Sequence, residues 1–212
     1  LSIVLGDVDR DGDLDLVAGN VQEANRLYLN NGTADPWAGV VGSNITSDFD
    51  HTFSVALGDV DRDGDLDLVA GNYGQPNRLY LNNGTADPWA GVTGSNITAD
   101  EYDTLSIVLG DVDRDGDLDL VAGNVQEANR LYLNNGTADP WAGVVGSNIT
   151  SDFDHTFSVA LGDVDADGDL DLVAGNDGEP NRLYLNNGTA DPWAAVPGTN
   201  ITADEHDTRS IV

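Results

Sequence analysis

The sequence predicts an all-β protein assembled from four near-identical units of 52 residues in tandem. The first observation is the period itself, because tryptophan recurs at this step, at Trp37, Trp89, Trp141 and Trp193. The second is that each unit contains short runs of β-branched and leucine residues between asparagine, glycine and aspartate, a pattern typical of strands and turns. The third is a larger repeat, because residues 1–61 are identical to residues 105–165. Repeated units of this length need neighbours against which to bury their faces.

Four strands are expected in the first unit. Ser2 to Leu5 is an apolar run and the expected innermost strand, and Leu14 to Ala18 follows an acidic loop. In Arg26 to Leu29, the alternation places two leucines on one face. Asn-Asn-Gly at 30–32 is a turn signal, because asparagine and glycine accept positive φ. A fourth strand is expected between Ala38 and Thr46.

Four strands in 40 to 50 residues, repeated along the chain, indicate the blades of a β-propeller. The predicted blades are residues 1–53, 54–105, 106–157 and 158–209. Residues 210–212 are expected to begin a further strand, because Ser210-Ile211-Val212 matches Ser2-Ile3-Val4. The near-identity of the units suggests recent amplification or deliberate design. The chain is therefore expected to be either a single propeller domain or a window on a longer array.

An acidic loop stands between the first two expected strands of every unit. In the first unit it reads Gly6-Asp7-Val8-Asp9-Arg10-Asp11-Gly12-Asp13-Leu14-Asp15, and it returns at 58–67, at 110–119 and, with Ala166 in place of the arginine, at 162–171. Carboxylates at alternate positions, with a glycine at the sharp turn, are what a hard cation with oxygen ligands requires. Five like charges in nine residues would repel one another strongly without a cation between them. The sequence therefore predicts one Ca²⁺ per repeat, four in total.

The expected ligands follow the spacing of the loop. Asp7, Asp9 and Asp11 are expected to supply carboxylates. Asp13 is expected to offer its backbone carbonyl, and Asp15 to close the shell directly or through water. The loop differs from a helical EF-hand, because an alanine stands at position 12 and the flanks are strand-like. The candidate metal residues of the four repeats are Asp7, Asp9, Asp11, Asp13, Asp15, Asp59, Asp61, Asp63, Asp65, Asp67, Asp111, Asp113, Asp115, Asp117, Asp119, Asp163, Asp165, Asp167, Asp169 and Asp171.

The stretch from Ser54 to Asn72, with the loop at its centre, resembles the FG-GAP or VCBS repeat of integrin-α-like β-propellers. The stretch from Arg78 to Gly84 continues the resemblance, which covers all four units. The resemblance implies blades arranged round an axis, with calcium in the hairpin between the first two strands of each blade. It implies no particular ligand, because the family includes adhesion receptors, lectins and bacterial surface proteins.

The number of blades is where this chain departs from the family pattern. Integrin heads resemble seven-bladed rings, whereas this chain has four units. A closed four-bladed ring, an eight-bladed ring of two chains and an array that continues beyond both ends all agree with the sequence. A contact between blades that does not close a ring would build a filament.

Composition restricts the partners. The formal net charge is −30, which argues against nucleic acid and against anionic membrane surfaces. No apolar run approaches the roughly 20 residues of a membrane span, so no membrane insertion is expected, and no signal peptide is visible. The start at Leu1 rather than at a methionine is what removal or omission of an N-terminal segment would leave. An extracellular or cell-surface location is expected, because the calcium sites of extracellular modules bind in the range of ~10⁻⁴–10⁻³ M.

Two further motifs recur in every unit. Sequences of the glycosylation type begin at Asn31 and Asn44, and a turn role explains the first of them without further assumptions. Asp-Pro-Trp at 35–37 recurs as well. Its tryptophan is expected in the core between blades rather than in a sugar-binding pocket.

The function that the sequence favours is a calcium-binding, extracellular structural or adhesive module that is multivalent or self-assembling, into a filament or surface layer if the array continues. Its expected partner is itself or an extracellular protein or glycan. The alternative is a carbohydrate-binding, lectin-like propeller with one pocket per blade. No catalysis is expected, because near-identical copies offer no unique catalytic constellation and no Gly-x-Ser-x-Gly elbow is present.

Overall fold

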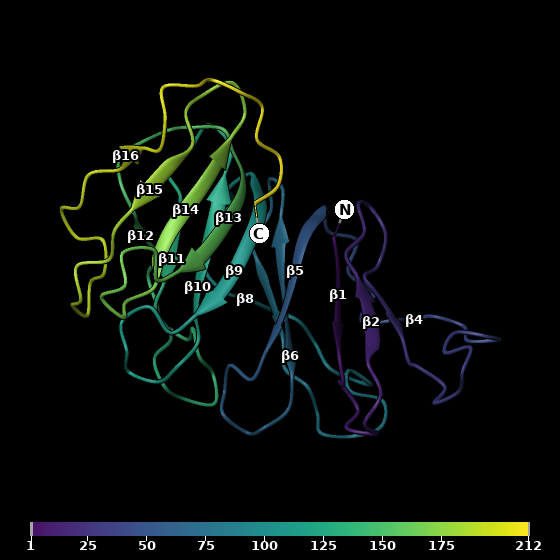
Figure 1. Ribbon diagram of the computed structural model, residues 1–212. Coiled ribbons are helices and arrows are strands. Elements are labelled where there is room, and N and C mark those ends of the chain that lie inside the picture. Colours follow the sequence, from purple (N-terminus) through teal and green to yellow (C-terminus); the bar gives the residue numbers. More distant parts are fainter. Residues whose placement is uncertain (1, 212) are drawn as a thin grey trace.

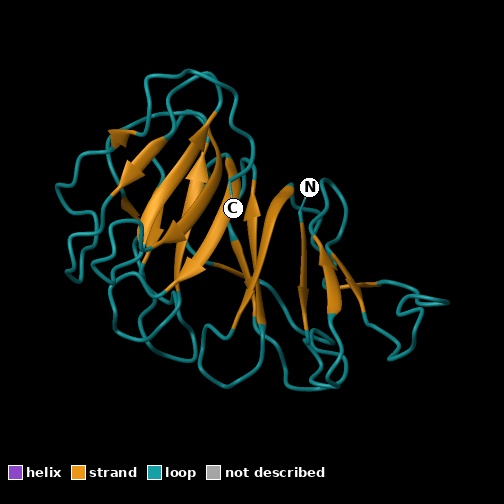
Figure 2. Ribbon diagram, viewed as in Figure 1, coloured by secondary structure: helices purple, strands orange, loops and turns teal. Residues whose placement is uncertain are grey.

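The computed structural model describes residues 2–211, which form sixteen strands and no helix (Figures 1 and 2). This range accordingly holds no helix of the length and apolarity that crossing a bilayer requires. The strands are β1 (Ile3–Gly6), β2 (Asp15–Ala18), β3 (Arg26–Tyr28), β4 (Ser43–Asn44), β5 (Thr52–Gly58), β6 (Asp67–Asn72), β7 (Arg78–Tyr80), β8 (Ser95–Asn96), β9 (Thr104–Gly110), β10 (Asp119–Asn124), β11 (Arg130–Tyr132), β12 (Ser147–Asn148), β13 (Thr156–Gly162), β14 (Asp171–Asn176), β15 (Arg182–Tyr184) and β16 (Thr199–Asn200).

The strands form four antiparallel sheets of four, each an up-and-down meander in chain order. We call these sheets blades 1 to 4. In blade 1, Gly6 of β1 lies opposite Asp15 of β2, so the acidic loop closes the hairpin between the first two strands. The strands of blade 1 lie within a residue of where the sequence placed them, except that the fourth strand comprises only Ser43–Asn44 of the expected range 38–46. The prediction of an all-β chain of repeated four-stranded units is confirmed.

The first strand of blades 2, 3 and 4 begins two residues before the boundary that the repeat suggested. In blade 2 the cause is an irregularity after Thr52, which pairs with Asn72 across the strands. The Thr52 hydroxyl donates to Asn72 Oδ1 at 2.8 Å and accepts a hydrogen bond from Asn25 Nδ2 of blade 1 at 3.1 Å. This buried polar contact lengthens the strand and joins the two blades where the chain passes from one to the next.

A separate apolar cluster fills each space between neighbouring blades. Between blades 1 and 2, Val8, Val17, Leu27 and Ile45 of blade 1 pack against Val55, Leu68, Ala70, Tyr80 and Trp89 of blade 2. The equivalent positions of the later repeats form the clusters between blades 2 and 3 and between blades 3 and 4. Each blade therefore has two different apolar faces, one for the preceding blade and one for the following blade.

The four blades follow one another in an open arc (Figure 1). The innermost strands β1, β5, β9 and β13 each contact the next, but among residues 2–211 no comparable contact joins β13 or β14 to β1 or β2. The closed four-bladed ring, one of the arrangements compatible with the sequence, is therefore not formed. The bulky side chains between neighbouring blades set the rotation from one blade to the next. Over four blades this rotation adds up to less than a full circle.

Candidate metal centre

The acidic loop turns sharply because two of its residues adopt left-handed backbone conformations. In blade 2 these are Arg62, with φ of 62°, and Gly64, with φ of 91°. The second value favours glycine, since a side chain there is strained. The amide of Gly64 donates to Asp59 Oδ2 at 3.0 Å, which anchors the first aspartate of the loop. The turn thus brings residues at both ends of the loop close together.

One group of three aspartates forms in each loop, with carboxylate oxygens within 4.8 Å of one another. The groups are Asp7, Asp9 and Asp15; Asp59, Asp61 and Asp67; Asp111, Asp113 and Asp115; and Asp163, Asp165 and Asp171. Three carboxylates at this separation are a ligand set suited to a hard divalent cation. The structure therefore brings together the first and third positions in every repeat, with the ninth position in three repeats and the fifth in one.

The first aspartate of the loop presents an oxygen without a hydrogen-bond donor. In the first three repeats Oδ1 of Asp7, Asp59 and Asp111 is buried and accepts no hydrogen bond, whereas Oδ2 accepts one from the loop glycine. A buried carboxylate oxygen without a donor costs free energy, and a bound cation would remove that cost. The donor set fits calcium, because all of these ligands are oxygens in a loop that can adapt its geometry.

The ninth position braces the hairpin as well as contributing to the cluster. Asp67 is fully buried, and its Oδ2 and Oδ1 accept hydrogen bonds from the amides of Val60 at 3.0 Å and Asn82 at 2.8 Å. Burial raises the pKa of Asp67 to about 7, and that of Asp119, its equivalent in blade 3, also to about 7. A cation nearby would favour the charged carboxylates that burial disfavours.

The seventh position lies outside the aspartate groups, because its carboxylate pairs with an arginine of the preceding blade. Asp65 Oδ1 lies 2.7 Å from Nε of Arg10, and Asp117 Oδ1 lies 2.6 Å from Nε of Arg62. The third such pair joins Asp169 to Arg114. That this residue ligates through its backbone carbonyl stays a prediction, and its side chain has a different role, which is to join neighbouring blades.

Two residues that hold the loops in place are not evident from the sequence. One is the loop arginine, whose partner lies in the loop of the next blade. The other is Asn82, whose Nδ2 donates to the carbonyls of Val8 in blade 1 at 2.8 Å and Leu66 at 3.1 Å. The sequence indicates this asparagine only as part of a turn. The arginine, the aspartate and the asparagine recur with the same 52-residue period, which is the one signal of these contacts in the sequence. The period alone does not show which repeats contact each other.

The recurrent turn and tryptophan motifs have structural roles. Nδ2 of Asn83, in the second unit, donates hydrogen bonds to the carbonyls of Asp87 at 3.1 Å and Ala90 at 3.2 Å. N-glycosylation would modify this same nitrogen, which is here engaged in the turn. Trp141 is buried between blades and its Nε1 donates to the carbonyl of Tyr132 at 3.2 Å. Trp89 and Trp193 are buried likewise, so the prediction of a core tryptophan is confirmed for three units.

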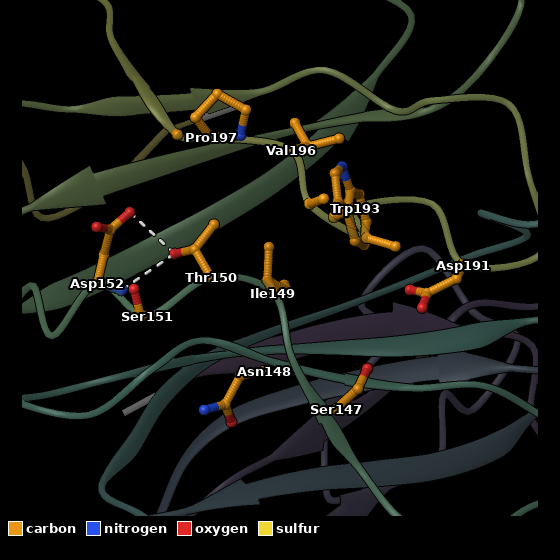
Figure 3. A pocket seen from close by; sticks show the side chains of 13 residues that line it. Ser147, Asn148, Ile149, Thr150, Ser151, Asp152, Asp191, Trp193, Val196 and Pro197 are labelled. Carbon is orange, nitrogen blue, oxygen red and sulfur yellow. Dashed lines mark hydrogen bonds between the residues drawn. The ribbon is translucent and has the colours of Figure 1, made fainter.

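A shallow groove runs along the outer edge between blades 3 and 4 (Figure 3). It has a volume of about 540 Å³ and lies between residues 147–152 of one blade and residues 191–198 of the other. Thr150 lies in the groove, where its hydroxyl donates to Asp152 Oδ2 at 2.9 Å. A similar groove of about 390 Å³ lies at the equivalent positions between blades 2 and 3.

Comparison with known families gives one match that recurs along the chain. The model of the FG-GAP-like repeat matches residues 7–70, 59–122 and 111–174. Each match begins at the first aspartate of a loop and extends into the second strand of the next blade. The matches together cover most of the chain, from the first calcium-type loop to the fourth.

The chain is also similar to curated relatives and to solved structures. The chain is 27% identical over 206 residues to cartilage acidic protein 1 of Mus musculus and of Homo sapiens, covering 89% of this chain and 31% of each relative. It therefore spans about a third of the length of these relatives. A lectin of Agrocybe aegerita, described as specifically recognising non-reducing terminal N-acetylglucosamine, has a TM-score of 0.61 at 19% identity, over 95% of this chain and 52% of the lectin. The V. cholerae biofilm matrix protein Bap1 has a TM-score of 0.42 at 18% identity, over 88% of this chain and 29% of that protein.

Proposed function

Because this chain belongs to the FG-GAP-like repeat family, we propose that it is a calcium-stabilised extracellular module with a structural or adhesive role and no catalytic activity. Each repeat binds one Ca²⁺ in the loop between its first two strands. The ion joins the two ends of the hairpin and cancels part of the charge of the loop. Calcium binding is therefore coupled to folding, since the unfolded chain offers no assembled site.

The observation that supports the calcium site most directly is the unpartnered buried oxygen of the first loop aspartate. It recurs at Asp7, Asp59 and Asp111, each time beside another carboxylate within 4.8 Å. Two carboxylates at such a distance repel each other, and burial strengthens the repulsion. A divalent cation between them converts this repulsion into attraction. The extracellular location follows from the millimolar calcium that such sites use.

Thermal unfolding in calcium and in chelator tests this proposal. A site at ten times its Kd contributes about 1.4 kcal/mol, so four sites add roughly 6 kcal/mol. For a chain of this size, 1 kcal/mol shifts Tm by about 2–4 °C, and chelation is expected to lower Tm by about 12–24 °C. Magnesium is the matched control and is expected to restore little of the loss, because it demands rigid octahedral geometry. An equal Tm in calcium and in excess chelator would refute the proposal.

Near-identical blades also favour multivalent binding or self-assembly. Linked copies of one weak site gain avidity without any new contact. Blades whose outer faces are unpaired can associate into rings or filaments, depending on whether the contact closes. In this proposal the partner is a second copy of the chain or an extracellular protein or glycan, and assembly forms part of the structural role.

A second candidate function is carbohydrate binding in the grooves between blades. The observation that favours it is that the groove recurs at the same positions between blades 2 and 3 and between blades 3 and 4. The edge of a tryptophan, Trp141 or Trp193, lies in each groove beside polar side chains. Titration of tryptophan fluorescence over a glycan panel tests it, and an unchanged spectrum with every glycan would count against it.

A further inference from the structure

The two ends of the arc expose apolar faces that are buried everywhere else in the chain. At the start of the chain, Trp37 of blade 1 is 43% exposed, whereas its equivalent Trp141 is 3% exposed. At the other end, Val164 and Ile201 of blade 4 are 53% and 51% exposed, whereas the equivalent Val60 is fully buried. Within residues 2–211, neither exposed face is covered by a blade as its counterparts are.

The exposed faces are the two halves of one interface. We call the first the head face, formed by Ile3, Leu16, Ala18, Tyr28 and Trp37, and the second the tail face, formed by Val164, Val173, Leu183 and Ile201. In the second repeat, the residues equivalent to the head face are those of blade 2 that cover blade 1. In the third repeat, the residues equivalent to the tail face are those of blade 3 that cover blade 4.

Shape agrees with this correspondence. The head face contains an apolar hollow of about 380 Å³, lined by Leu16, Ala18, Tyr28 and Trp37. In blade 2 the equivalent positions are packed against the valines, leucine and isoleucine of blade 1. The tail face presents the same two valines, one leucine and one isoleucine at the equivalent positions. It therefore has the side chains that fill this kind of hollow in the other three interfaces.

Polar groups at the two faces match as well. Asn82, Asn134 and Asn186 each donate to the carbonyl of a valine in the preceding blade at 2.8 Å. Each also donates within its own blade, and of these two bonds Asn30 of blade 1 makes, within residues 2–211, only the one inside the blade, to the carbonyl of Leu14 at 3.0 Å. Val164 supplies the corresponding carbonyl at the tail face.

Charges are complementary in the same way. Arg78 pairs with Asp48 of the preceding blade at 2.9 Å, and Arg130 pairs with Asp100 at 2.8 Å. The equivalent arginine of the head face is Arg26, and the equivalent aspartate of the tail face is the exposed Asp204. An ion pair between them would repeat the contact found inside the chain.

From these matches we infer that the head face of one copy of this chain docks on the tail face of a second copy, forming a fourth blade-to-blade interface between molecules. The contact is heterologous, so it either closes into a ring or continues as a filament. It deepens the self-assembly part of the proposed function by naming its surfaces. Calcium binding within each copy does not depend on it.

Residues near the chain end occupy part of this interface. Ile211 donates through its amide to Ser158 Oγ at 3.1 Å, as Ile107 does to Ser54 and Val159 to Ser106. Ser2-Ile3 of an incoming copy has the same sequence as Ser210-Ile211 and the same place in the repeat. The incoming strand therefore replaces this segment and makes the bond to Ser158 in its stead.

A mixing experiment with two variants tests the inference by sedimentation velocity in calcium. Trp37→Asp disables the head face, and Ile201→Asp disables the tail face. Both side chains are exposed, so each variant is expected to keep the wild-type Tm in dilute solution. The wild type is expected to form a two-chain ring or longer chains, each variant alone to remain monomeric, and the equimolar mixture to stop at a dimer. The mixture forms a dimer because each variant retains the face that the other has lost.

Two outcomes would overturn the inference. One is a wild-type chain that stays monomeric up to millimolar concentration in calcium. The other is a variant that still dimerises alone, which would indicate a symmetric contact through one face rather than a head-to-tail contact. Neither outcome bears on the calcium proposal, because the loss of Tm in chelator is measured on the dilute monomer.

A gain-of-function variant tests the register of the contact. Inside the chain each interface contains an arginine–aspartate pair, but at the tail face Ala166 stands in place of the arginine. Ala166→Arg would face Asp13 of the second copy and is expected to tighten association about two- to fivefold. Adding Asp13→Asn is expected to cancel the gain. A gain that survives this second change would contradict the predicted register.

Discussion

Aspartates that look alike in the sequence have three distinct roles within one loop. In the third repeat, Asp111 presents an unpartnered oxygen to the cluster, Asp119 braces the hairpin, and Asp117 pairs with Arg62 of the preceding blade. Their backbone positions decide these roles, because the turn brings the carboxylate of Asp111 into the cluster and directs that of Asp117 toward Arg62 of the neighbouring blade.

Calcium stoichiometry separates these roles. Asp111→Ala removes a carboxylate from the cluster and is expected to reduce the number of bound calcium ions from four to three, measured by isothermal titration calorimetry. The matched control Asp117→Asn removes the ion pair with Arg62 and is expected to keep four ions. It should lower Tm by a similar amount with and without calcium. Loss of an ion in the control would assign its carboxylate to the metal.

The pH dependence of stability is expected to change sign when calcium is removed. In the metal-free chain, burial raises the pKa of Asp67 and Asp119 to about 7 from the usual 3.8, and burial also raises the pKa of Asp61 and Asp113. A raised pKa in the folded state gives stability below pH 4 that is lost as pH rises toward 7. Tm in chelator should therefore be higher at pH 5 than at pH 7.5.

Saturating calcium reverses this expectation, because a bound cation holds the carboxylates in their charged form and lowers their pKa. Stability should then be lost as pH falls, so that Tm is higher at pH 7.5 than at pH 5. Asp67→Asn is the control and should flatten the slope in chelator. Slopes of the same sign in both conditions would contradict the assignment of these groups to the metal site.

At the scale of the blade, position in the array decides whether identical side chains are buried. Trp37 and Trp141 lie in identical stretches of sequence and occupy the same place in their blades. Trp141 packs in the cluster between blades 2 and 3, whereas no other blade within residues 2–211 covers Trp37. The contribution of a tryptophan to stability therefore depends on its neighbours and not on its local sequence.

Paired substitutions measure this difference. Trp141→Ala creates a cavity and removes a hydrogen bond to the carbonyl of Tyr132, so it is expected to cost about 3–5 kcal/mol of unfolding free energy. Trp37→Ala, its matched control, is expected to cost less than about 1 kcal/mol. Urea unfolding of the dilute protein in calcium measures both. Equal losses would mean that the head face is covered within the monomer.

Across the whole molecule, a net charge of −30 opposes the compact arc. Much of this charge lies in the four loops, all at the same end of their blades. Arginine pairs between blades and bound calcium both reduce the repulsion. Metal-free protein retains only the arginine pairs, so its stability should depend on screening by salt.

Salt is therefore expected to stabilise the metal-free chain and to have little effect on the calcium-bound chain. Raising sodium chloride from 0.01 M to 1 M shortens the screening length from about 30 Å to about 3 Å. Tm in chelator should rise over this range, and Tm in saturating calcium should rise less or fall as the arginine pairs are screened. A Tm in chelator that falls with salt would show that ion pairs outweigh repulsion.

Much of this protein could be predicted from local sequence. The order of the strands, the hairpin loops and the position of the acidic clusters follow from residue types within ten or fifteen positions of one another. Leucines and valines alternate in direction along the strands, glycine and asparagine permit the turns, and aspartates converge in the loop between the first two strands of each blade. These are short-range effects, and the repeat copies them four times, so the all-β fold and the place of the aspartate clusters were predictable.

The tertiary structure alone decided what happens between the blades. Identical sequence around Trp37 and Trp141 leads to one exposed and one buried side chain, and the carboxylate of Asp65 turns away from its own loop toward Arg10. Sequence could not assign these contacts, because every copy offers the same residues to every other copy. The angle between neighbouring blades decides which copies meet, and within residues 2–211 it leaves the head face and the tail face uncovered.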